Sequence, residues 1–288
     1  MIPDAAPSAP PPYTAGAYAR YGAALAVTVG AITSQYFVPK IAPVTGALYG
    51  SLAGGLAIVY GIPVAAFLGL VGVSPLRGYA RSMGRAGWEG LRWYGLLSAL
   101  ALVVTIGLVL VYEILDPAAL ELLNRPNPVL AAAASDPAFW IAFSFAVGAL
   151  EEAIFRGWIF GFWTGRGAWW VHATWTSALF AGVHLYYAST YAEASPLVYP
   201  TLFCLGFAFA ATYQASGGNL VIVALLHGAN DAAGFLSIVS PSLAVGAHLG
   251  LIGVGLLVAL LHFTGVRPFG PPVVPPPPPV APWLPPPP

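Results

Sequence analysis

The feature that most constrains this chain is a series of long apolar segments that carry almost no charge. We count eight segments long enough to cross a bilayer, which takes about 20 residues of helix. They cover residues 17–38, 47–73, 93–115, 138–163, 169–190, 196–215, 218–239 and 242–264. Charged residues make up only 7% of the sequence, against about 25% in a soluble domain. The chain is therefore predicted to be all-α, a polytopic membrane helical bundle of about eight transmembrane helices.

The basic residues predict how this bundle sits in the membrane. With the eight segments as spans, one side holds Arg20, Arg77, Arg81, Arg85, Arg92, Arg166 and Arg267, and the other holds Lys40 and Arg125. Cytoplasmic loops carry the excess of arginine and lysine in membrane proteins. Both termini are thus expected in the cytoplasm, and the composition suggests the inner (plasma) membrane of a bacterium.

The two ends of the chain differ from this membrane-embedded middle, which we expect to span residues 16–267. Residues 1–15 are rich in proline and alanine and are predicted to be disordered. Residues 268–288 contain 13 prolines in 21 positions, a composition typical of an extended polyproline II tail. Such a tail is either a solvated appendage or a ligand for an aromatic-lined groove on a partner. The zero net charge gives no indication of a nucleic-acid partner.

Three charged residues interrupt the segment 138–163. Glu152 and Arg156 are four apart, so on a helix they share a face and can form an ion pair. Glu151 points about 100° away from Glu152. Ionisable residues inside a membrane are costly and are functional by default. We interpret Glu152–Arg156 as a structural brace and Glu151 as the reactive group; the alternative is a charge cluster that only holds helices together.

Two later segments add further polar side chains. In the fifth segment, Phe180 and His184 are one turn apart. In the seventh, His227 is followed by Asn230 and Asp231, so all three can line one face. Imidazole and carboxamide N–H groups are donors that can stabilise an oxyanion. The alternative is a set of interhelical hydrogen bonds, each contributing about 1 kcal/mol or less.

The depth of these groups in the membrane indicates that they converge. Counted from the segment ends at 1.5 Å per residue, Glu151, His184 and His227 all fall in the central part of the bilayer. The remaining histidines have no acidic neighbour within a helical turn, and we interpret them as packing or interfacial residues. They are His172, His248 and His262.

Taken in order, the three motifs resemble the CAAX protease and bacteriocin-processing (CPBP) family, also called the Abi or type II CAAX prenyl endopeptidase family. Its pattern is EExxxR on one helix, FxxxH on the next, and HxxxN or HxxxD further on. Here it reads Glu151-Glu152-x-x-x-Arg156, Phe180-x-x-x-His184 and His227-x-x-x-Asp231. The resemblance covers roughly residues 138–239, about a third of the chain.

This resemblance implies an intramembrane glutamic endopeptidase that acts on a membrane-anchored protein or peptide. Glu151 and His184 would activate a water, and His227 with Asp231 or Asn230 would stabilise the oxyanion. Glu152, Arg156 and Phe180 would support the site. Some relatives cleave behind a prenylated cysteine, and bacterial ones are linked to peptide maturation, bacteriocin immunity or removal of sorting signals.

Asp231 departs from the asparagine that many family members have at this position. An ionised aspartate would repel an oxyanion, so three interpretations stay open: Asp231 is protonated, Asp231 orients His227, or Asn230 supplies the donor. No cofactor is expected, because the family is taken to be metal-free and HExxH is absent. The alternative is a zinc ion held by Glu151, His184 and His227 with water as fourth ligand.

Two other functions use the same residues. A proton-coupled transporter would use them as a relay, but the chain has no evident internal repeat. A non-catalytic membrane scaffold or immunity-type protein would keep them as structural contacts, and the proline-rich tail would bind its partner.

Overall fold

The computed structural model describes residues 14–41, 52–73, 85–115, 136–184, 195–238 and 240–269. Within these residues the protein is helical and has no strand, so the predicted all-α bundle is confirmed. The predicted disordered N-terminus and proline-rich tail lie almost entirely outside the described residues, and those expectations stay predictions.

Eight helical segments make up the described part of the chain, one for each predicted apolar segment. Their elements are α1 (Ala15–Ile41); α3 (Leu52–Leu56), η1 (Ala57–Gly61) and α4 (Ile62–Leu70); α6 (Arg85–Leu115); α9 (Pro137–Glu152), η2 (Ala153–Phe160) and η3 (Gly161–Trp163); α10 (Trp169–Val183); α12 (Ser195–Ala215); α13 (Leu220–Ala233) and η5 (Gly234–Ile238); and α14 (Pro241–Phe263). Among the described residues, three stretches are long and apolar enough to cross a membrane: Gly87–Val111, Pro137–Trp163 and Ser242–Phe263. Gly54–Leu70 and Leu220–Leu236 are shorter apolar helices. The protein is an integral membrane protein.

Local capping explains where several helices begin. Asp136 accepts a hydrogen bond from the backbone N–H of Phe139, and Pro137 fills the first position of α9. Asn219 caps α13 by accepting from the N–H groups of Val221 and Ile222. These caps satisfy backbone donors that would otherwise be costly in an apolar environment.

Two predicted boundaries differ from the structure. The third segment was expected from residue 93, but α6 begins at Arg85, because apolar composition marks the membrane-crossing part of a helix and not its whole length. The fifth was expected to reach residue 190, but α10 ends at Val183. There Nδ1 of the His184 ring donates to the carbonyl of Phe180 at 2.6 Å. This side-chain bond takes the acceptor that the next helical turn would use.

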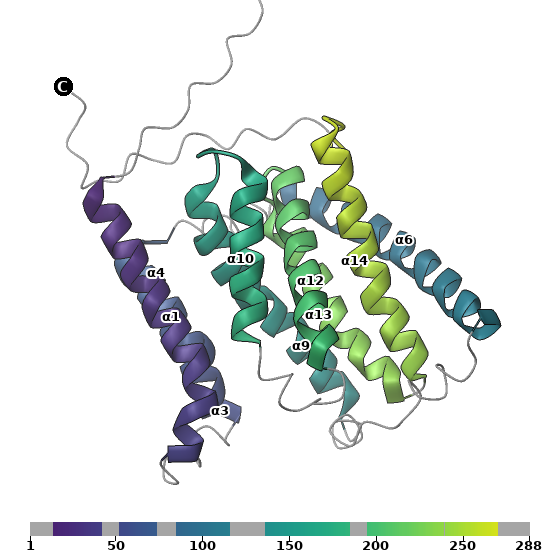
Figure 1. The fold of residues 1–288 in the computed structure, drawn as a ribbon, viewed down its shortest axis with the longest axis horizontal. Coiled ribbons are helices and arrows are strands. Elements are labelled where there is room, and N and C mark those ends of the chain that lie inside the picture. Colours follow the sequence, from purple (N-terminus) through teal and green to yellow (C-terminus); the bar gives the residue numbers. More distant parts are fainter. Residues whose placement is uncertain are drawn as a thin grey trace, which may run out of the picture.

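The helices form a bundle in which the N-terminal pair stands at one edge (Figure 1). Helices α1 and α4 lie side by side there, and α6 lies at the opposite edge against α14. Between them, α9 packs on α13, and α12 packs on both α10 and α14. The element that follows α9 is a π-helix, η2, and all eight of its residues are buried.

Glycines let α9 and α13 approach closely. A Cβ on Gly148 would come within 2.6 Å of the backbone N of Gly228, and a Cβ on Gly228 would come within 2.6 Å of Cα of Phe145. Close approach through small residues is how helices pack in lipid. This contact lies one turn before Glu151 and one residue after His227, so it sets how near the motifs of the two helices come.

We predict that Gly148→Ala destabilises the bundle by roughly 1–3 kcal/mol, since the new methyl group overlaps backbone that cannot move away. Gly253→Ala is the matched control, because a Cβ there meets nothing within 4 Å. Thermal unfolding in detergent, followed by dye labelling of the single cysteine Cys204, measures both. Equal melting temperatures for the two variants would show that the glycine contact is not needed.

Candidate active site

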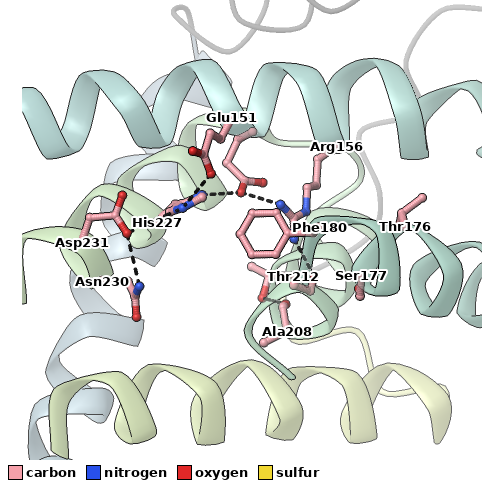
Figure 2. A network of polar contacts seen from close by, with 12 residues as sticks. Glu151, Arg156, Thr176, Ser177, Phe180, Ala208, Thr212, His227, Asn230 and Asp231 are labelled. Carbon is pink, nitrogen blue, oxygen red and sulfur yellow. Dashed lines mark hydrogen bonds and ion pairs between the residues drawn. The ribbon is translucent and has the colours of Figure 1, made fainter. Parts of the chain in front are cut away.

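Side chains from α9 and η2, from α10 and from α13 meet in one cluster, in which Figure 2 labels Glu151, Arg156, Phe180 and His227. Glu151 and Glu152 close the last turn of α9, and His184 follows the last residue of α10. His227, Asn230 and Asp231 lie on the second half of α13. The structure therefore assembles all three motifs in one cluster.

Glu152 and Arg156 form the buried base of the cluster. Nη1 of Arg156 donates to Oε1 of Glu152 at 2.8 Å, and Nη2 donates to the carbonyl of Gly206 at 2.7 Å. The two side chains are 0% and 2% exposed. A buried charge requires such pairing, because transfer from water into an apolar medium is otherwise prohibitive.

The same carboxylate oxygen also binds His227. Nδ1 of His227 donates to Oε1 of Glu152 at 2.7 Å, so one atom joins α13 to the ion pair on α9 and η2. The Phe209 ring stacks on the His227 ring, with centroids 4.9 Å apart. His227 is thus fixed in position and orientation, and its Nε2 lies 3.5 Å from Oε2 of Glu151.

One carboxylate oxygen of Glu151 faces two histidines, His184 and His227, which come from the other two helices. Its Oε2 lies 3.5 Å from Nε2 of His184 and 3.5 Å from Nε2 of His227. Among the described residues this buried oxygen accepts no hydrogen bond. Its Oε1 accepts one from the hydroxyl of Tyr60 at 2.7 Å. The carboxylate is therefore held at one oxygen, and the other points between two imidazole rings.

The backbone bond of His184 determines what its other nitrogen can do. Since a carbonyl only accepts, the bond to Phe180 requires a proton on Nδ1. In the neutral ring Nε2 is then an acceptor, and it lies 3.5 Å from Oε2 of Glu151, which is also an acceptor. Two acceptors of this kind are the arrangement that general-base chemistry on a water needs.

The Phe180 ring lies close to the Arg156 guanidinium and to both imidazoles. Its ring centroid lies 4.9 Å from Cζ of Arg156, 4.4 Å from the His184 ring and 5.8 Å from the His227 ring. A guanidinium over an aromatic face is a favourable cation–π contact. Phe180 therefore supports three charged or polar groups at once, which explains a phenylalanine one turn before the histidine.

The Asn230–Asp231 pair forms a second branch. Oδ1 of Asp231 lies 3.7 Å from Nε2 of His227 and accepts from the Asn230 amide at 3.4 Å. Oδ1 of Asn230 accepts in turn from Nδ1 of His248, on α14, at 2.8 Å. The Asn230 amide group is thus directed at Asp231, and Asp231 is the group that lies beside His227.

Exposure is unequal across the cluster. The side chains of Glu152, Arg156 and His227 are almost fully buried, whereas His184 is 17% and Asp231 32% exposed. The cluster is therefore accessible on the side of His184 and Asp231, and the buried Glu152–Arg156 ion pair lies on its inaccessible side.

The sequence did not indicate five of the contacts that build the site. Tyr60 lies 91 residues before Glu151 in an apolar segment, and its only signal was a phenol whose hydroxyl needs a partner inside a membrane. His248, interpreted from the sequence as a packing residue, contacts Asn230. Only the tertiary structure identifies Glu152 as the partner of His227. The same holds for the contacts made by the Gly206 carbonyl and the Phe209 ring.

Among the described residues, no group of three or more His, Cys, Asp or Glu side chains is arranged to hold a metal ion. The expectation of a metal-free site is not tested by this arrangement and stays a prediction.

We expect Arg156→Met to destabilise the protein by about 3–5 kcal/mol, because it leaves Glu152 buried without a counter-charge. The double variant Arg156→Met/Glu152→Met, which removes both charges, should recover most of that loss. Thermal unfolding of both variants measures the difference. If the double variant is as unstable as Arg156→Met, the isolated charge is not the cause.

Comparison with known families agrees with this geometry. Residues 133–233 match the family model described as Type II CAAX prenyl endopeptidase Rce1-like, and this range contains all three motifs. The resemblance drawn from the motifs is thereby confirmed. Comparisons with curated proteins and with solved structures found no match. Over residues 133–233, this chain is similar to the Rce1-like type II CAAX prenyl endopeptidases.

Proposed function

We propose that the protein is an intramembrane endopeptidase that hydrolyses a peptide bond of a membrane-anchored protein or peptide. The observation that carries the proposal is the position of Oε2 of Glu151, 3.5 Å from Nε2 of both His184 and His227. Each of these three side chains is held through another of its atoms, to Tyr60, Phe180 or Glu152. A preorganised set of this kind lowers the barrier because it needs no rearrangement during the reaction.

In the proposed reaction, Glu151 and His184 activate a water molecule. The water oxygen attacks the carbonyl carbon of the scissile bond while its proton passes to Glu151, and a tetrahedral oxyanion forms. The C–N bond then breaks, and the proton returns to the leaving amine. The substrate carbonyl would enter from the exposed side of the cluster, near His184 and Asp231.

His227 stabilises the oxyanion as an imidazolium, together with the Asn230–Asp231 branch. Its Nδ1–H is bonded to Glu152, so the N–H that donates to the oxyanion is the one on Nε2. Of the three interpretations of Asp231, we propose the protonated acid that donates to the oxyanion. Asn230 is engaged by His248 and directs its own amide at Asp231, so Asn230 acts through its neighbour. An ionised Asp231 beside His227 would oppose the developing negative charge.

Glu152, Arg156 and Phe180 keep the reacting groups in position. Glu152 orients His227, Arg156 neutralises Glu152, and Phe180 packs against Arg156 and both histidines. The reaction as proposed needs no cofactor, and zinc held by Glu151, His184 and His227 is the alternative. We further propose a bacterial inner (plasma) membrane location with both termini in the cytoplasm, from the distribution of arginine and lysine.

We predict that Glu151→Gln lowers cleavage by at least about a hundredfold, since the amide cannot accept the proton of water. The gene is deleted, restored as wild type or as Glu151→Gln, and new termini of membrane-anchored polypeptides are mapped by mass spectrometry. A set of termini that returns only with wild type identifies the substrate class.

The matched control for that experiment is Glu89→Gln, a carboxylate of α6 outside the cluster. It should restore the same termini as wild type. If Glu151→Gln restores the phenotype of the deletion strain as well as wild type does, and no termini differ between the strains, the protease is refuted and a scaffold is favoured. Loss of wild-type cleavage in purified membranes with 1,10-phenanthroline, recovered on adding zinc, would instead support the metal alternative.

For Asp231, we predict that Asp231→Asn retains most of the cleavage, because it keeps a donor beside His227 and removes a potential charge. Asp231→Leu, which has no donor, should lose about 10²–10³-fold in rate. The rates are measured on the termini identified above. A severe loss in Asp231→Asn would show that the carboxylate itself is required, as an acceptor that orients His227.

A further inference from the structure

The N-terminal helices contribute a side chain to the site although they lie outside the region that matches the family. Tyr60 belongs to η1, the π-helical stretch between α3 and α4. Its hydroxyl donates to Oε1 of Glu151 at 2.7 Å. The matched region is residues 133–233, so this contact comes from a part of the chain that the family comparison does not describe.

The contact determines the direction of the reactive oxygen. The terminal torsion of a glutamate is broad and roughly two-fold, so the carboxylate alone has no fixed orientation. A hydrogen bond from a phenol to a charged acceptor is short and strong. With Oε1 held by Tyr60, Oε2 is left facing His184 and His227.

Independent contacts fix the helices that carry Tyr60. The indole N–H of Trp158 donates to the carbonyl of Gly72 at 2.9 Å, and its ring stacks on Phe67 with centroids 5.4 Å apart. The hydroxyl of Tyr21, on α1, donates to the carbonyl of Ile159 at 3.1 Å and accepts from the indole of Trp163 at 3.2 Å. The N-terminal pair is therefore docked along η2 and η3, the elements that follow Glu151 directly.

We propose that Tyr60 is a positioning residue for Glu151, and that the N-terminal helix pair is an obligatory part of the enzyme. The inference rests on the proposed function, since it assigns Tyr60 a role in the same reaction. Tyr60 acts through the carboxylate and does not itself react. The N-terminal helices thus align the base as well as adding membrane anchorage.

Tyr60→Phe tests the proposal, with Tyr21→Phe as its matched control. Each variant deletes one hydroxyl that bonds across the same interface, but only Tyr60 bonds the carboxylate. The probes are internally quenched peptides: one carries the cleavage sequence found by terminus mapping, and one ends in a prenylated CaaX sequence. The enzyme is assayed in liposomes of phosphatidylethanolamine and phosphatidylglycerol.

We expect Tyr60→Phe to lower kcat by roughly tenfold to a hundredfold, the usual effect of a bond to a charged group, with KM unchanged. Tyr21→Phe should keep the wild-type kcat even where it lowers the melting temperature. Equal kcat for wild type and Tyr60→Phe would overturn the inference. A parallel loss of kcat in both variants would also overturn it, because general loosening of the interface would then be the cause.

A second measurement tests the contact without any activity. 3-Fluorotyrosine is incorporated at position 60, and its ¹⁹F chemical shift is compared in wild type and in Glu151→Ala, with Gly253→Ala as a remote control. A shift change confined to Glu151→Ala supports the hydrogen bond, and identical shifts overturn it. Failure of the wild type to cleave any probe would refute the proposed function, while the ¹⁹F result would still decide the contact.

Discussion

The rest of the site depends on one oxygen atom, Oε1 of Glu152. It accepts a hydrogen bond from Arg156 and another from His227, and it lies where water cannot reach it. In such surroundings a carboxylate is tolerated only when a counter-charge balances it and hydrogen bonds reach it. The requirement couples α9, η2 and α13 to one another, and through the Gly206 carbonyl it also includes α12. The register of four helical elements therefore follows from satisfying one buried charge.

The neighbouring carboxylate has different partners. In both glutamates Oε1 accepts hydrogen bonds, and among the described residues the buried Oε2 accepts none. The two differ in what lies around them: Glu152 is paired with the Arg156 cation, whereas Oε2 of Glu151 lies 3.5 Å from two imidazole rings. The ion pair makes Glu152 part of the framework, and the proposed role of Glu151 as a base uses the oxygen that faces the imidazoles. This division gives two chemically identical side chains different tasks.

Much of this architecture could be predicted from the sequence, because it depends on the periodicity of the helix and on the free-energy cost of placing charge in hydrocarbon. The apolar segments are visible because hydrocarbon excludes charge, and the Glu152–Arg156 pair follows from helical spacing alone. Contacts between distant segments could not be predicted in this way. Tyr60 has an apolar sequence environment, and nothing near it along the chain indicates Glu151 as its partner. His248 likewise has no polar neighbour on its own helix. The end of α10 was missed because it depends on the His184 ring bonding a backbone carbonyl, which hydropathy does not register.

The π-helical stretch that follows Glu152 has a consequence for how this chain tolerates changes in length. A π-turn holds one residue more than an α-turn, and removing that residue would rotate everything beyond it by about 100° relative to the carboxylates. Of the two indoles on which the N-terminal helices dock, Trp158 lies within this stretch and Trp163 lies beyond it. The stretch Ala153–Phe160 therefore sets the angle between these indoles and the Glu151 carboxylate. A single-residue deletion in this stretch would leave the protein helical and inserted in the membrane. It would also rotate the indoles that the N-terminal helices contact relative to the Glu151 carboxylate.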